Sequence, residues 1–216
     1  MKKQLLFISA LVLGSLGWGQ RKPIKVACVG NSITYGYGIE NREQNSYPSV
    51  LQHLLGKGYK VENFGHSGAT LLSKGHRPYI QQEEYQKALA FAGDIVVIHL
   101  GINDTDPRNW PNHRNDFVKD YLTLISSFKK ANLKAHIVIA RMSPLSHRHP
   151  RFESGTRDWH AEIQQAIALV AQQTNAQLID FHEPLYHFPQ MLPDAVHPNA
   201  QGAAILAQVV FGAITG

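Results

Sequence analysis

Four short polar segments of the chain carry side chains that together could transfer an acyl group. They are Gly30-Asn31-Ser32-Ile33-Thr34, Gly65-His66-Ser67-Gly68, Gly101-Ile102-Asn103-Asp104 and Asp194-Ala195-Val196-His197-Pro198. The segments offer a hydroxyl, a glycine that a ligand can approach closely, a side-chain amide, and a carboxylate three residues before an imidazole. A serine nucleophile, its base and an oxyanion hole require these groups.

Ser32 is the predicted nucleophile. It follows the apolar run 24–30, and Gly30 permits a tight turn into a helix. The first N–H groups of that helix would face a negative charge developing beside the serine. Taken alone, Ser32 could equally be a helix N-cap or a turn residue, so the other segments must support the catalytic interpretation.

Asp194 and His197 are the predicted orienting acid and base. The spacing of three residues lets one loop carry both side chains, and Pro193 and Pro198 restrict that loop on either side. Asp194 can accept a hydrogen bond from one ring nitrogen, so that the other nitrogen takes the proton of Ser32. The pair could instead cap the final helix, but its place after an amino-terminal serine favours catalysis.

Gly68 and Asn103 are the predicted donors of the oxyanion hole, together with the backbone N–H of Ser32. Asn103 follows the apolar run 95–100, so a strand would deliver its amide to the edge that Ser32 also reaches. Gly68 has no side chain to keep an oxyanion away from its N–H. Taken separately, Asn103 could be an Asx-turn residue and Gly68 an ordinary turn glycine.

Strand-like and helix-like segments alternate along the chain. Apolar runs predict buried strands over 24–30, 59–64, 94–100, 134–140 and 176–179. Helical spacing predicts helices over 47–55, 81–91, 117–130, 156–173 and 200–210. The alternation predicts a parallel sheet with helices on both faces, because parallel strands need crossover connections. Ligands of such sheets bind at the carboxyl ends of the strands, where the polar segments would lie.

The first 19 residues are predicted to be a cleavable signal peptide, followed by one domain over residues 20–216. Two lysines, an apolar run of about a dozen residues and a Gly-Trp-Gly segment follow one another there. The run is shorter than the roughly 20 residues that a membrane span needs. The mature protein is therefore expected in the periplasm or outside the cell, without a membrane anchor.

Composition disfavours a nucleic-acid partner. The chain has 21 Lys and Arg residues against 16 Asp and Glu residues, and without Lys2 and Lys3 the basic excess falls to three. These charges are scattered and form no stripe. The single cysteine, Cys28, lies inside a strand-like run, which predicts a buried thiol and excludes a disulfide within one chain. The histidines outside the four segments lack the spacing of a metal site, so no metal is predicted.

Taken together, the four segments resemble the blocks of the SGNH, or GDSL-type, hydrolase family, which supply serine, glycine, asparagine and histidine in this order. The resemblance covers essentially the whole mature chain. It implies that Ser32 is the nucleophile, His197 the base and Asp194 its orienting acid. It also implies that Gly68 and Asn103 complete the oxyanion hole.

The same resemblance implies a flavodoxin-like three-layer α/β/α fold with five parallel strands in the order 2-1-3-4-5, and no cofactor. One position departs from the family pattern. The usual acidic residue before the serine is Asn31 here, which keeps the hydrogen-bonding shape but loses a charge.

The loops after the first two strands are similar to those of sialate O-acetylesterases and related carbohydrate esterases of this family. Four side chains of the sheet-edge loops are predicted substrate contacts: Tyr35, Tyr37, Arg77 and Trp110. The rings of Tyr35, Tyr37 and Trp110, and that of Tyr79, could stack on sugar faces. Arg77, Arg148 and Arg151 could pair with the carboxylate of an acidic sugar, such as O-acetylated sialic acid.

The sequence therefore predicts an exported serine esterase that removes acetyl groups from a small-molecule or glycan ester. Lysophospholipases and thioesterases have the same fold and the same blocks, so a lipid esterase is the first alternative. A carbohydrate-binding module without catalysis is the second, motivated by Asn31 and the aromatic residues. A flavodoxin is the third, although the loop after Ser32 and Thr34 has few groups to hold a phosphate.

Overall fold

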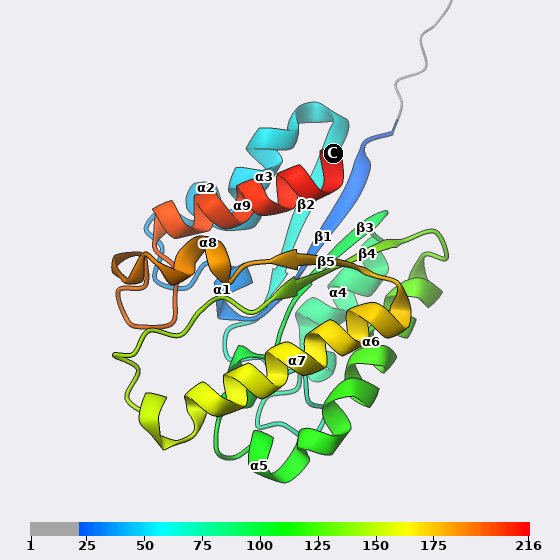
Figure 1. The fold of residues 1–216 in the computed structure, drawn as a ribbon. Helices are drawn as coiled ribbons and strands as arrows, with labels where there is room; N and C mark the ends of the chain where they lie inside the picture. The colour runs from blue at the N-terminus through cyan, green and yellow to red at the C-terminus, as the bar shows by residue number, and fades with distance from the viewer. Residues whose placement is uncertain (1–21) are drawn as a thin grey trace, which may run out of the picture.

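The computed structural model describes residues 22–216, and a five-stranded parallel sheet forms the centre of that part of the chain (Figure 1). The strands are β1 (Ile24–Gly30), β2 (Tyr59–Gly65), β3 (Ile95–His99), β4 (His136–Arg141) and β5 (Gln177–Asp180). Their order in the sheet is β2-β1-β3-β4-β5. The predicted fold class and strand order are thus confirmed. The predicted signal peptide, residues 1–19, lies outside the described residues and stays a prediction.

The apolar runs form the sheet because helices cover it on both sides and remove its side chains from water. Residues 26–29 of β1 have no exposed surface, and 97–99 of β3 are equally buried. Gly30 is level with Gly65 on one side and with His99 on the other. The carboxyl ends of the three neighbouring strands therefore meet in one row, directly below the polar segments that follow them.

Two helical layers enclose the sheet (Figure 1). Helices α3 (Tyr47–Leu55) and α9 (Ala200–Thr215) pack together on one face. Helices α4 (Glu83–Phe91), α6 (Phe117–Ala131) and α7 (Thr156–Thr174) cover the other. Spacing explains their burial: α6, for example, buries Phe117, Tyr121, Leu124, Ile125 and Phe128, which recur every three or four residues on one side of the helix.

Short helices occupy the connections at the carboxyl edge of the sheet. They are α1 (Ser32–Tyr35), α2 (Arg42–Asn45), α5 (Trp110–His113) and α8 (Glu183–Tyr186). Single 3₁₀ turns lie at Gly56–Gly58, Tyr79–Gln81, Ile102–Thr105, Arg114–Asp116, Phe152–Ser154 and Pro189–Met191. Within residues 22–216, no helix combines the length and the apolar character that crossing a membrane demands.

Element ends differ from the prediction by a few residues, for local reasons. Strand β4 begins at His136, not Lys134, because the N–H of Ala135 donates to the carbonyl of Asn132 in a tight turn. Helix α9 continues five residues beyond the predicted Val210, and its added turns still pack on the core. Cys28 is buried as predicted, and burial raises the pKa of its thiol to about 12.

Gly65 illustrates how closely the sheet edge is packed against α1. A Cβ atom at Gly65 would lie 2.1 Å from the backbone nitrogen of Tyr35 and 2.7 Å from the carbonyl carbon of Thr34. We expect Gly65→Ala to lower the free energy of unfolding by about 1–3 kcal/mol, because backbone atoms must move to admit the methyl group. Denaturant titration measures the change.

Gly58→Ala is the matched control, because a Cβ atom there meets nothing within 4 Å. Its effect should stay within about 0.5 kcal/mol of zero. Equal destabilisation by the two substitutions would contradict the close packing inferred at Gly65.

Candidate active site

Ser32 lies at the first turn of α1, immediately after β1. Asn31 caps this helix, and its Oδ1 accepts a hydrogen bond from the N–H of Ile33 at 3.0 Å. The amide of Asn63 holds the other end of α1 by donating to the carbonyl of Thr34 at 2.8 Å. Ser32 is thus fixed between the ends of β1 and β2, and only a small part of its surface is exposed.

His197 joins Ser32 to Asp194 in a continuous hydrogen-bond relay. Its Nε2 lies 2.8 Å from Oγ of Ser32, and its Nδ1 lies 2.6 Å from Oδ2 of Asp194. A carboxylate only accepts hydrogen bonds, so Nδ1 must carry the ring proton. The neutral ring then presents the lone pair of Nε2 to the serine hydroxyl, the arrangement a general base requires.

Asp194 fixes the backbone of the loop before α9. Oδ1 of Asp194 accepts hydrogen bonds from the N–H groups of Val196 at 3.1 Å and His197 at 2.8 Å. Partial burial alone would raise the pKa of Asp194, but the backbone and side-chain hydrogen bonds of His197, with that of Val196, hold it below the usual value. Asp194 therefore stays an acceptor for His197 throughout the neutral pH range.

Gly68 and Asn103 line one cavity of about 210 Å³ together with Ser32 and His197. Gly68 has a φ of 80°, a left-handed conformation that glycine adopts without strain. The amide of Asn103 donates to the carbonyl of Ala69 at 2.9 Å, which ties it to the loop that carries Gly68. The structure thus brings all five residues predicted for catalysis and the oxyanion hole to one place.

Asp104 is a positioning residue that the sequence reasoning did not single out. Its fully buried carboxylate accepts hydrogen bonds from the N–H groups of Leu71 and Leu72, both at 2.9 Å. These bonds fasten the loop after β2 to the loop after β3. Burial raises the pKa of Asp104 to about 7, despite the hydrogen bonds that favour its charged form. Its place directly after Asn103 was the only signal in the sequence.

The four predicted substrate contacts have different outcomes. Tyr37 lines the Ser32 cavity, is 53% exposed, and its ring centre lies 4.7 Å from that of His197. Arg77 lines the same cavity and donates to the carbonyl of Ser67 at 2.9 Å. Tyr35 is partly exposed, but its ring lies against the Arg42 guanidinium and not in the cavity.

Trp110 was predicted wrongly. Its ring is buried against Phe117, and its Nε1–H donates to the carboxylate of Glu162 at 2.6 Å. Its apolar surface is therefore used inside the protein and cannot stack on a sugar. Tyr79 is also fully buried, and its hydroxyl donates to the carbonyl of Phe64 at 2.8 Å. Arg148 is likewise occupied, since its guanidinium donates to the carbonyls of Pro189 and Leu192.

Among residues 22–216, no three histidine, cysteine or acidic side chains are grouped in a way that could hold a metal ion. The site around Ser32 offers a hydroxyl, an imidazole, a carboxylate and N–H donors. Together they fit nucleophilic attack on a carbonyl carbon.

Comparison with known proteins identifies the family. The sequence model of the GDSL-like Lipase/Acylhydrolase family matches residues 28–205. The chain belongs to this family. The resemblance inferred from the four polar segments is thereby confirmed, and the predicted enzyme class, a carboxylic ester hydrolase, agrees with a family of lipases and acylhydrolases.

An acetylxylan esterase of Xylanibacter ruminicola is similar to this chain in sequence. It is 36% identical over 207 residues, in a match that covers 88% of this chain and 43% of that protein. This GDSL-like chain thus spans less than half the length of that relative.

Several solved structures share the fold of this GDSL-like chain. The native aryl esterase of M. smegmatis has a TM-score of 0.68 at 16% identity, covering 89% of this chain and 98% of that one. A carbohydrate acetylesterase family member from Sinorhizobium meliloti has a TM-score of 0.67 at 19% identity, covering 88% and 97%. At these identities the likeness shows the fold alone.

The buried carboxylate of Asp104 should leave a signature in the pH dependence of stability. Its pKa is raised from 3.8 in the unfolded chain to about 7 in the fold, chiefly by burial. The unfolded chain therefore loses this proton first, and the contribution of Asp104 to the free energy of unfolding falls as pH rises through this window. The fall is at most about 1.4 kcal/mol per pH unit and levels off above the folded-state pKa.

In Asp104→Asn this contribution is absent, so the difference in unfolding free energy between wild type and variant should change between about pH 4 and pH 7. Denaturant titrations across that range measure it. Asp158→Asn, which makes the same exchange on the exposed start of α7, is the control and should change the free energy of unfolding by no more than about 0.5 kcal/mol. A constant difference for Asp104→Asn would refute the raised pKa.

Proposed function

We propose that this chain is a serine esterase that removes acetyl groups from carbohydrates. The observation that carries the proposal is the relay from Ser32 through His197 to Asp194, with distances of 2.8 and 2.6 Å. It opens into the cavity that Gly68 and Asn103 also line. Nucleophile, base and oxyanion donors therefore surround one point where an ester carbonyl can bind.

In the proposed reaction, Oγ of Ser32 attacks the carbonyl carbon while Nε2 of His197 takes its proton. The negative charge on the carbonyl oxygen is stabilised by the N–H groups of Ser32 and Gly68 and by the amide of Asn103. The bond to the sugar oxygen then breaks, and His197 returns the proton to that oxygen. Water attacks the acetyl-Ser32 ester, again with His197 as base, and acetate leaves as Ser32 is restored.

A short acyl group suits the size of the site. The cavity around Ser32 has a volume of about 210 Å³, and Tyr37 and Arg77 stand among its walls. The acetylxylan esterase relative supports acetyl as the acyl group and a carbohydrate as the alcohol. O-acetylated sialic acid is a second candidate within this class. A screen of acetate release from acetylxylan, acetylated pectin, O-acetylated sialic acid and short-chain lipid esters tests both the sugar and the acyl specificity.

Ser32→Ala should abolish hydrolysis of p-nitrophenyl acetate while leaving the fold intact, because no other hydroxyl in the cavity has a base 2.8 Å away. Turnover and circular dichroism spectra together measure this. A fluorophosphonate should label the wild type and not the variant, which separates an esterase from a binding module.

Ser126→Ala is the control, since Ser126 lies on the exposed side of α6. It should retain full turnover and labelling. Unchanged turnover in Ser32→Ala would overturn the proposed nucleophile.

Asn103→Ala should lower kcat for the same substrate about 10²- to 10³-fold, because one donor to the oxyanion is removed. KM should change little, since the charge develops only in the transition state. Steady-state kinetics separate the two constants. Asn112→Ala, which alters an exposed amide of α5, should keep both constants, and a loss confined to KM in Asn103→Ala would contradict the assigned role.

A further inference from the structure

A second cavity adjoins the Ser32 cavity and shares Asn103 and His197 with it. Its volume is about 230 Å³, and its remaining polar lining includes Asp106, Arg108 and Arg151. We call it the arginine cavity. A substrate whose acetyl group lies at Ser32 would extend the rest of its structure past Asn103 or His197, and the arginine cavity is the space that opens there.

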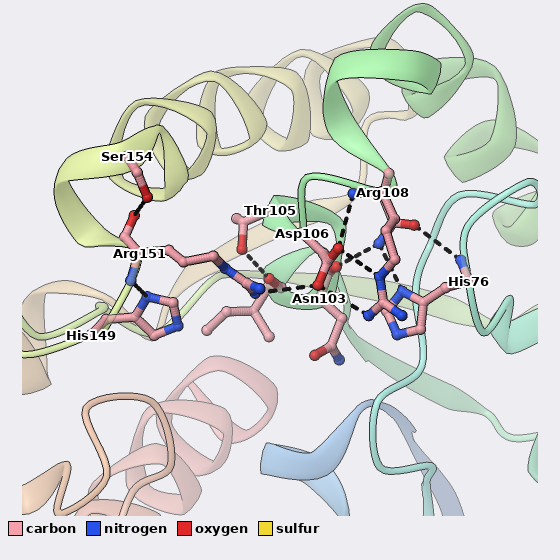
Figure 2. Close-up of polar contacts among 10 residues, drawn as sticks. His76, Asn103, Thr105, Asp106, Arg108, His149, Arg151 and Ser154 are labelled. Carbon is pink, nitrogen blue, oxygen red and sulfur yellow. Dashed lines mark hydrogen bonds and ion pairs between the residues drawn. The ribbon is translucent and has the colours of Figure 1, made fainter.

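Asp106 holds both guanidinium groups in place. Oδ1 of Asp106 accepts from Nε of Arg108 at 2.8 Å, and Oδ2 accepts from Nη2 of Arg108 at 3.1 Å and from Nη2 of Arg151 at 3.2 Å. Figure 2 shows the two arginines reaching Asp106 from opposite sides. The carboxylate is only 12% exposed, whereas Arg108 is 65% and Arg151 47% exposed. Each guanidinium therefore keeps N–H groups that Asp106 does not use.

One net positive charge remains in this cluster, because two guanidiniums face one carboxylate. The hydrogen bonds and charge of Arg108, followed by that of Arg151, lower the pKa of Asp106 to about 2 despite partial burial. Asp106 is thus ionised at any physiological pH, and the two arginines are positioned before a ligand arrives. Such positioning reduces the entropy lost when an anion binds to the N–H groups that Asp106 does not use.

Two histidines of the arginine cavity are also set as donors. Oδ1 of Asn109 accepts a hydrogen bond from the backbone N–H of His76. Nδ2 of Asn109 therefore donates to the ring atom Nδ1 of His76, 2.9 Å away. Nδ1 of His149 accepts from the N–H of Arg151 at 3.2 Å. In both neutral rings the proton is therefore on Nε2. Burial, with the charge of Arg151, lowers the pKa of His149 and keeps that ring neutral.

We propose that the arginine cavity binds the carboxylate of an acidic sugar while the acetyl group lies at Ser32. The free N–H groups of Arg151 and Arg108 can form charge-assisted hydrogen bonds with both oxygens of such a carboxylate. A neutral sugar would leave the net charge of the cavity without a partner. This inference rests on the proposed acetylesterase function and narrows its substrate class.

The carboxylate has two sources. It belongs either to the acetylated sugar itself, as in O-acetylated sialic acid, or to a uronic acid attached beside a neutral acetylated sugar. Both place an anion within one sugar of the ester, so the same contacts serve both. Calorimetry with a ligand of each kind distinguishes the two sources.

Binding is measured by isothermal titration calorimetry with the Ser32→Ala protein, which cannot consume the ligand. The ligands are an acetylated xylo-oligosaccharide, the same oligosaccharide with a glucuronic acid side group, and O-acetylated sialic acid. We expect at least one acidic ligand to bind about tenfold more tightly than the neutral oligosaccharide, since its carboxylate forms charge-assisted hydrogen bonds that the neutral ligand lacks. Whichever acidic ligand shows the gain identifies the source of the carboxylate.

Arg151→Gln, added to Ser32→Ala, should reduce this preference to near unity. It removes the net charge of the cavity while leaving the two-point pair between Arg108 and Asp106. Arg157→Gln is the matched control, because Arg157 is an equally exposed arginine six residues away that pairs with Glu153 and Asp158 and does not line the cavity. It should leave the preference unchanged.

Equal affinity for acidic and neutral ligands, or the same loss of preference in Arg157→Gln and Arg151→Gln, would overturn the inference. The proposed function fails in a different way. If wild-type protein releases no acetate from any ester, yet the Ser32→Ala protein still prefers the acidic ligand, the carboxylate site stands and the esterase does not. If acetate is released but no preference exists, the esterase stands alone.

Discussion

The hydrogen bonds of the buried Asp104 carboxylate are the interaction on which the proposed oxyanion hole depends. These two hydrogen bonds to the backbone of Leu71 and Leu72 connect the loop that carries Gly68 to the loop that carries Asn103. A buried carboxylate is costly, because water no longer solvates it. In return, the loops that carry Gly68 and Asn103 are held in fixed positions. Hydrogen-bond donors that need not reorganise during the reaction stabilise a transition state best.

Strand order and the convergence of Ser32, Gly68 and Asn103 could be predicted because both follow from a repeating physical rule. Buried parallel strands are continuous apolar runs, and the residues directly after them must meet at one edge. Ser32 and Asn103 follow two such strands and line the same cavity, as this rule predicts. Trp110 does not line this cavity, because its place in an edge loop does not determine where its ring faces. Phe117 and Glu162 determine that, and Glu162 comes from a helix 52 residues later.

The contact between Asp106 and Arg151 could not be predicted for a related reason. The two residues are 45 positions apart, both lie in irregular loops, and no periodicity links them. Ser32, Gly68 and Asn103 are thus positioned by strand ends, whereas Asp106 and Arg151 are positioned by loops that only the folded chain brings together. This difference separates a reaction shared across a fold from recognition that belongs to one protein.

The hydrogen bond between Ser32 and His197 joins residues 165 positions apart. Ser32 follows the first strand of the described chain, and His197 precedes its last helix. The site is therefore formed by the two ends of the domain. No interaction between residues close in sequence brings Ser32 and His197 together. Detachment of α9 would separate His197, the proposed base, from Ser32, the proposed nucleophile. Ester hydrolysis should therefore depend on the docking of the carboxyl-terminal helix α9.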